Sequence, residues 1–312
     1  GGRGGAMPAS QRGLERARDR LVHSGAYDPP PAAVREYLRL VREAKVRHSE
    51  DVAEYGALLL KKSPGILPAE ELWLVHEQVG VAALDCGGFE LADWCIGRLD
   101  KQFPNSVRVR KLKGMRLEAG GEFDAADKLY KGILEENQAD QAAWKRRVAV
   151  CRGRGNLVKA TKVLKEYLDI FASDHEAWEE AADLYLCLGM HKQAAFCQEE
   201  LILSNPQNPH FHLQYADTLC TLGQPANLRT ALAYYAAALE LTDGLSVRAL
   251  LGACGAYAHL NALKGPEKAT EEEARVPQLA AKLLKQLYGK KCPAKLPLLL
   301  ELLTKQGLHD SS

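Results

Sequence analysis

The sequence lacks long apolar runs and a charge excess of either sign. Its longest apolar stretches, such as ALLL at 57–60 and LPLLL at 296–300, are far shorter than the roughly 20 residues of a transmembrane helix. The 41 basic and 40 acidic residues give a formal net charge of +1. No global field therefore draws the chain to nucleic acid or to anionic lipid, and any such contact has to be local.

Catalytic and metal-binding motifs are also missing. The sequence has no Gly-rich phosphate loop, no His-Glu-x-x-His and no nucleophile elbow. The eight cysteines include no pair two or three apart, which predicts small buried side chains in a reducing compartment rather than a zinc or redox site. His210 and His212 point in different directions if they lie on a helix. We therefore predict no enzyme, no cofactor, no metal site and no small-molecule substrate.

What the sequence does contain is a 34-residue period. It is marked by Gly87, Gly121, Gly155, Gly189 and Gly223, and by Ala92, Ala126, Ala160 and Ala194. This is the period of the tetratricopeptide repeat, a helix–turn–helix unit. Glycine accepts the left-handed backbone that ends the first helix, and a small residue such as Gly114 within that helix lets the second helix approach. The period predicts an all-α fold, a right-handed superhelical solenoid of tetratricopeptide repeats.

The period also divides the chain into segments. Residues 73–245 hold five repeats, predicted as ten antiparallel helices, with an insertion after the last of the five glycines. Residues 29–72 are predicted as N-terminal helices, a candidate divergent repeat, and residues 1–28 as a disordered segment. Residues 246–312 contain a degenerate repeat, a polar loop at 261–277 and C-terminal capping helices.

Charge is distributed unevenly along the repeats. From Gln141 to Lys165 there are eight basic residues and no acidic ones, whereas from Ser173 to Glu200 seven acidic residues accompany only Lys192. One interpretation is a solvated surface with ion pairs between neighbouring repeats, each contributing about 0–1 kcal/mol. The other is a binding groove that is basic at one end and acidic at the other.

The second interpretation predicts particular side chains. First helices line the concave face of such arrays, and repeat positions two, five, nine and twelve point into the groove. The candidate partner-binding residues are Arg108, Lys111, Met115, Lys145, Arg152, Glu176, Glu179 and Asp183. Such a groove suits an extended polypeptide of mixed charge. Trp144 and Trp178, one period apart, are predicted to pack between neighbouring helices. The alternative is a tryptophan platform for a peptide or a base.

Several stretches are more specific than the repeat pattern. They are LWLVHEQVGVAALDCGGFELADWC (72–95), FPNSVRVRKLKGMRLEAGGEFDAADKLYKGIL (103–134), DHEAWEEAADLYL (174–186) and AAFCQEELILSNPQNPHFHLQYAD (194–217). They closely resemble the family of subunit 2 of the endoplasmic reticulum membrane protein complex. The resemblance extends from about residue 70 to about residue 260.

The resemblance implies a non-catalytic cytosolic scaffold that supports insertion of the transmembrane helices of tail-anchored and multi-pass proteins. Its implied partners are other subunits of that complex, namely the cytosolic segments of membrane subunits and a soluble subunit. Its implied location is peripheral, on the cytoplasmic side of the endoplasmic reticulum membrane. The alternative is a tetratricopeptide adaptor that binds RNA or another polyanion through basic repeats two and three. The acidic fourth repeat and the few aromatics near the basic cluster make nucleic acid the less favoured partner.

Overall fold

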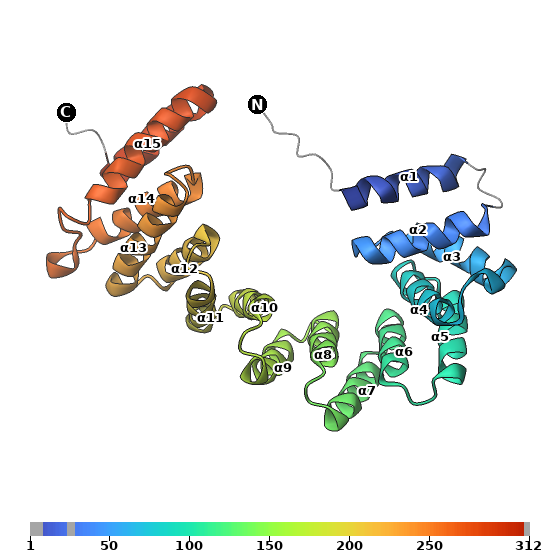
Figure 1. The fold of residues 1–312 in the computed structure, drawn as a ribbon. Coiled ribbons are helices and arrows are strands. Elements are labelled where there is room, and N and C mark those ends of the chain that lie inside the picture. The colour runs from blue at the N-terminus through green and yellow to red at the C-terminus, as the bar shows by residue number, and fades with distance from the viewer. Residues whose placement is uncertain (1–8, 24–28, 309–312) are drawn as a thin grey trace. The chain divides into compact units, whose positions relative to one another are not determined.

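The chain folds into helices joined by short turns (Figure 1). The computed structural model describes residues 9–23 and 29–308, and within them it shows sixteen α-helices, three short 3-10 turns and no strand. The predicted all-α class and the tetratricopeptide arrangement of helix pairs are confirmed. Two compact units, residues 1–155 and 156–312, divide the helices between them. The handedness of the predicted solenoid stays a prediction.

The first unit contains eight helices, each packed against the next along the chain. They are α1 (Ala9–His23), α2 (Pro31–Ala44), α3 (Ser49–Lys62), α4 (Ala69–Asp85), α5 (Phe89–Gln102), α6 (Val107–Ala119), α7 (Phe123–Glu136) and α8 (Gln141–Gly153), with a 3-10 turn, η1, at Pro64–Ile66.

The second unit also contains eight helices that pack in chain order. They are α9 (Leu157–Ile170), α10 (His175–Cys187), α11 (His191–Ser204), α12 (Pro209–Leu222), α13 (Pro225–Leu241), α14 (Val247–Asn261), α15 (Arg275–Lys291) and α16 (Leu296–Lys305). Two 3-10 turns lie at Gly265–Glu267 (η2) and Pro293–Lys295 (η3).

The five periodic glycines lie where the sequence predicts them, at the ends of first helices. Their φ angles are all positive, between 69° and 77°. After α4, the N–H of Gly88 donates to the carbonyl of Ala83 (2.7 Å), and that of Gly87 donates to the carbonyl of Leu84 (3.2 Å). This pair of bonds is the Schellman motif, which satisfies carbonyls that the helix leaves open. Gly223 differs, because α12 runs up to Leu222 and the glycine itself is the cap.

The periodic alanines lie where two helices of one repeat meet. Ala92, Ala126, Ala160 and Ala194 are completely buried, and so is Ala231, which the insertion displaces along the fifth repeat. Within first helices, Gly114 shows why a small residue is needed. A Cβ at this position would lie 2.5 Å from Cζ of Tyr130, a fully buried ring on α7. Helix α6 can therefore approach α7 this closely only without a side chain.

The N-terminal segment differs from the prediction of disorder over residues 9–23, which form α1. Leu14, Ala17 and Leu21 recur at helical spacing, are buried, and pack into the core of α2 and α3. Their burial stabilises a helix that the polar composition of the segment did not predict. The rest of the predicted disordered segment, residues 1–8 and 24–28, lies outside the described residues.

The C-terminal part of the second unit has its own small core. Leucines of α14, α15 and α16 form it, together with Cys254, Ala280, Ala281 and Leu308. The predicted polar loop 261–277 contains η2 and is tied to α13 by Arg229, whose Nε donates to the Glu273 carboxylate (2.7 Å) and whose guanidinium also donates to the carbonyl of Glu267 (3.1 Å). Helix α15 begins inside the predicted loop range, at Arg275.

Candidate partner-binding surfaces

The predicted groove residues of α6 contact other side chains of the first unit. Arg108 forms an ion pair with Glu77 of α4 (2.6 Å). Lys111 forms one with Asp140 (2.9 Å), which also caps α8 by accepting from the N–H of Ala143 (3.0 Å). Burial raises the pKa of Asp140, but the hydrogen bonds from Lys111 and from backbone N–H groups lower it more, so the net pKa lies below the usual value. Both basic groups thus have internal carboxylate partners.

Met115, the third predicted residue on α6, is half-buried. It packs against two small apolar clusters that α4, α5 and α6 share. Most of this side chain therefore contributes to packing between helices. Only its remaining exposed part is available to a partner.

Most other basic side chains of α6 and α8 are also ion-paired. Arg110 pairs with Glu136 (2.7 Å), Lys113 with Asp100 (2.6 Å), Arg116 with Asp93 (2.9 Å), Arg146 with Glu118 (3.3 Å) and Arg154 with Asp124. In each pair a basic residue on a first helix, or at its C-cap in the case of Arg154, meets an acidic residue of a neighbouring helix. Ion pairs between helices, the first of the two interpretations of the charge pattern, therefore account for most of this basic surface.

The ion pair between Arg147 and Asp127 is buried. Nε of Arg147 on α8 donates to the carboxylate of Asp127 on α7 (3.0 Å), and both side chains are 8% exposed. The Arg147 guanidinium also lies over the Trp144 ring, 5.4 Å from its centroid. Trp144 is buried and its indole N–H donates to the carbonyl of Gln138 (3.0 Å), so its predicted packing role is confirmed.

The other predicted groove residues lie on α8 and α10. Lys145, which is half-buried, and Arg152, which is exposed, are seven apart on α8 and share a face. Glu176, Glu179 and Asp183 are exposed on one face of α10. The first pair belongs to the first unit and the acidic set to the second unit. The structure thus groups these residues within each unit, and a groove that includes both sets stays a prediction.

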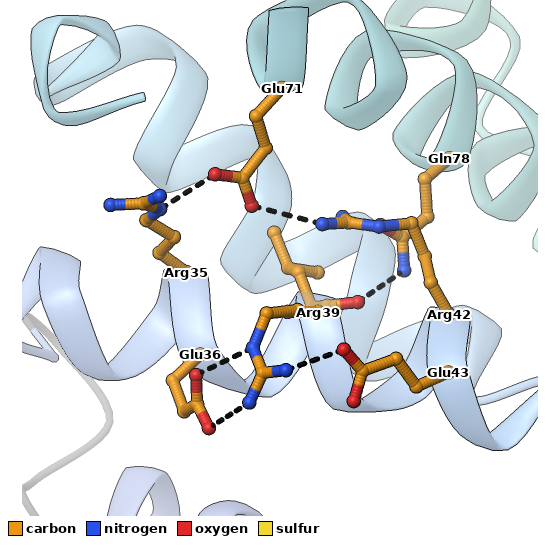
Figure 2. Close-up of polar contacts among 8 residues, drawn as sticks. Arg35, Glu36, Arg39, Arg42, Glu43, Glu71 and Gln78 are labelled. Carbon is orange, nitrogen blue, oxygen red and sulfur yellow. Dashed lines mark hydrogen bonds and ion pairs between the residues drawn. The ribbon is translucent and has the colours of Figure 1, made fainter. Parts of the chain in front are cut away.

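A polar network that the sequence did not predict joins α2 to α4 (Figure 2). Glu71 of α4 accepts hydrogen bonds from Arg35 (2.7 Å) and Arg42 (2.9 Å) of α2. Gln78 accepts from Arg42 (2.6 Å) and donates to the carbonyl of Leu38 (3.1 Å). These contacts join residues that are 29 to 40 apart in the sequence, and they fix the N-terminal helices on the first repeat.

The second unit contains a cleft between the second helices of two consecutive repeats. Its volume is about 820 Å³, and it lies between α9 and α11 with α10 as its floor. Trp178, Ala181 and Tyr185, on one face of α10, form that floor. The indole N–H of Trp178 donates to the carbonyl of Ala172 (2.8 Å), which fixes the orientation of its ring.

An aromatic side chain stands on the wall of this cleft. Phe196 of α11 is 53% exposed, and its ring meets that of Trp178 edge to face, with 6.0 Å between centroids. Beneath it, Cys197 is buried, and burial raises the pKa of its thiol to about 12. The thiol therefore stays neutral and contributes packing rather than reactivity.

Charged groups without ion-pair partners surround the cleft. Lys165, Asp169 and Lys192 are exposed at its edge, and Glu200 is half-buried there. Within the described part of the chain, none of these four charges lies in an ion pair. They contrast with the paired basic residues of α6. The sequence prediction missed this site because it considered only first helices; the available signal was Phe196, a large aromatic that shares one side of α11 with Lys192, Gln193 and Glu200.

A smaller cleft of about 470 Å³ lies in the first unit, among α4, α5 and α6. Trp73 and Phe103 line it edge to face, with 5.7 Å between centroids. Arg108 stands at its edge, so one predicted groove residue borders an apolar hollow. Each unit thus carries a cleft with an aromatic pair.

Among residues 9–23 and 29–308, no helix is both long and apolar enough to cross a membrane. Within the same residues, no group of three or more His, Cys, Asp or Glu side chains could hold a metal ion.

Helix pairs, turn glycines and buried alanines at a 34-residue period define a tetratricopeptide-repeat protein. Residues 101–228 match the model of the EMC2 TPR-like repeat domain. ER membrane protein complex subunit 2 of Xenopus tropicalis is 36% identical over 266 residues, which cover 85% of this chain and 89% of that protein. The Dictyostelium discoideum protein of the same name is 36% identical over 211 residues, covering 67% and 66%. The chain belongs to the ER membrane protein complex subunit 2 family.

A solved structure supports the fold alone. The C-terminal part of a TPR repeat-containing protein from Cytophaga hutchinsonii aligns with a TM-score of 0.52 at 13% identity, over 90% of this chain and 97% of that one. The family resemblance predicted from the sequence is confirmed. The prediction that the chain is not an enzyme agrees with this family of repeat scaffolds.

Proposed function

We propose that this chain is a non-catalytic scaffold subunit of the endoplasmic reticulum membrane protein complex. It holds cytosolic segments of membrane subunits, and a soluble subunit, on the surfaces of its repeats. It lies peripherally on the cytoplasmic side of the membrane and supports insertion of the transmembrane helices of tail-anchored and multi-pass proteins. Support comes from the family, whose relatives are named as subunits of that complex, and from the two clefts.

The observation that carries the proposal is the cleft of the second unit. An exposed aromatic beside an apolar floor favours a partner, because covering a large apolar side chain contributes about 1.5–3 kcal/mol. Aromatic anchors in a pocket supply much of the binding energy of protein interfaces. The unpaired Lys165 and Lys192 favour acidic groups on the partner, and Asp169 and Glu200 favour basic ones. A segment that combines an apolar anchor with charges of both signs fits this site.

The predicted groove residues form a secondary binding surface in this proposal. Lys145 and Arg152 on α8, and Glu176, Glu179 and Asp183 on α10, contact partner segments of mixed charge. Arg108 and Lys111, which form internal ion pairs with Glu77 and Asp140, border the same proposed surface. The scaffold itself performs no bond-forming step; its contribution is to hold partner segments in fixed positions.

A co-purification experiment tests the proposal. Phe196→Ala removes the anchor of the cleft, and Lys145→Glu with Arg152→Glu reverses charge on α8. Leu203→Ala is the matched control, because Leu203 lies on the same helix as Phe196 and is 76% exposed. Helicity and melting should stay close to wild type in all three, since none of the substituted side chains is buried in the core.

The measured quantity is the recovery of partner subunits from detergent-solubilised membranes. Phe196→Ala should lower it at least about tenfold, as expected for a loss of 1.4 kcal/mol or more. The charge reversal should lower it too, and the control should not. Wild-type recovery in every variant would reject the proposal. Salt-steep capture of RNA that only the charge reversal abolishes would favour the polyanion adaptor instead.

A further inference from the structure

The second unit separates its charges along the chain. Residues 156–274 contain 16 acidic and 8 basic residues. Residues 275–308, which form α15, η3 and α16, contain seven basic residues and only one acidic residue, Glu301. Glu301 is itself paired with Lys305 (2.7 Å). The C-terminal helices thus form a locally basic end on an acidic unit.

The basic charge is concentrated at the turn between α15 and α16. From Gly289 to Leu298, a segment we call the α15–α16 tip, every residue is exposed except Leu296, which is half-buried. Lys290, Lys291 and Lys295 lie in this tip, and none of them forms an ion pair with a described residue. The dipole of α15 favours cations near its last turn. It does not explain the apolar side chains that accompany them.

Leucines are exposed beside these lysines. Helix α16 buries Leu299 and Leu303 in the C-terminal core, yet Leu298 is 68% exposed and Leu302 is 42% exposed. Leu298 and Leu302 are four apart and therefore share one flank of the helix. A helix with a second apolar face outside the core indicates a surface that something covers.

We propose that the α15–α16 tip binds the surface of an anionic lipid bilayer. Lys290, Lys291 and Lys295 contact the phosphate headgroups, while Leu298 and Leu302 enter the interface between headgroups and acyl chains. Clustered lysines are attracted to anionic leaflets, and apolar side chains next to them add burial in the interface. A projecting turn needs no matching cavity on a fluid surface, whereas an acidic protein would need a complementary shape. This inference depends on the second unit alone and requires no partner subunit.

Vesicle binding by the purified full chain tests the proposal. Phosphatidylcholine vesicles with phosphatidylserine should bind the chain, and those without it should not; added salt should weaken binding. Each lysine near an anionic surface contributes about fivefold, so Lys290→Gln, Lys291→Gln and Lys295→Gln together should lower the partition coefficient on the order of 100-fold. Leu298→Ser should lower it about tenfold. The matched control is Lys162→Gln, Lys264→Gln and Lys268→Gln, three exposed lysines elsewhere in the unit.

A second measurement places the tip in the bilayer. Cys292 is an exposed cysteine within the tip and can carry an environment-sensitive dye once Cys86 and Cys187, which are also exposed, are replaced by serine. Phosphatidylserine vesicles should shift the dye emission to the blue, and Leu298→Ser should reduce the shift. Equal loss of binding in the control triple variant, or no dye shift on bound vesicles, would overturn the proposal. Binding to polyglutamate but not to vesicles would also overturn it and would assign the tip to an acidic polypeptide.

Discussion

Gly114→Ala is a direct test of the repeat packing. The added methyl would lie 2.5 Å from Cζ and 2.6 Å from the hydroxyl oxygen of Tyr130. That ring cannot move aside easily. It is completely buried, and its hydroxyl donates to the carboxylate of Glu118 (2.5 Å). Burial and this hydrogen bond raise the pKa of Tyr130, so the phenol stays protonated and keeps donating.

The expected change in the free energy of unfolding follows from two opposing effects. Alanine is better than glycine in a helix interior by about 1 kcal/mol. Overpacking a well-packed contact costs about 1–3 kcal/mol, and a rigid, hydrogen-bonded ring places this case at the upper end. We expect Gly114→Ala to destabilise the chain by about 1–2 kcal/mol. In the Tyr130→Ala background the overlap disappears, so there Gly114→Ala should stabilise by about 1 kcal/mol.

Urea denaturation followed by circular dichroism measures these differences through the midpoint and slope. The control is Gly97→Ala on α5, where an added Cβ meets nothing within 4 Å. It should stabilise the chain by about 0.5–1 kcal/mol. If Gly114→Ala is as stable as Gly97→Ala, or if its cost is unchanged in the Tyr130→Ala background, the close approach of α6 to α7 is wrong.

Three further predictions concern packing and charge. Ala160→Arg places a charge where two helices meet and should lower the free energy of unfolding by about 3 kcal/mol or more, seen as a lower melting temperature. An unchanged melting curve would contradict the repeat register. Asp127→Ala leaves the buried Arg147 without this carboxylate and should lower the free energy of unfolding, measured by urea denaturation, by about 3–5 kcal/mol. Asp127→Leu with Arg147→Met should lower it far less. The folded-state pKa of Asp140 is lowered, so the ionised carboxylate stabilises the fold above its unfolded pKa of about 3.9, and this stabilisation is lost as pH falls through the folded pKa. Asp140→Asn should remove this part of the acid dependence. An unaltered curve of stability against pH would refute this prediction.

The architecture could be predicted because its markers are local. A glycine with positive φ and an alanine at a helix contact are each dictated by one residue type at one position, and both recur every 34 residues. Helix α1 could not be predicted in the same way. Leu14, Ala17 and Leu21 become informative only when the core of α2 and α3 is there to receive them. The cleft of the second unit needed three helices at once, and only the structure brings Trp178 and Phe196 together.

The distribution of charge shows most clearly what could not be predicted from the linear sequence. The basic run of the second and third repeats predicted a basic surface, yet in the first unit most basic side chains of α6 and α8 pair with acidic residues of neighbouring helices. Arg147 meets Asp127 twenty residues away, and Arg116 meets Asp93 twenty-three residues away. Charge of one sign along a helix therefore becomes alternating charge in space. Lys165 and Lys192 differ, because neither forms an ion pair with a described residue, although Asp169 and Glu200 line the same α9–α11 cleft. Basic side chains that form no ion pair within the fold remain available to a partner, and this supports the proposed binding surface at the cleft between the second helices α9 and α11.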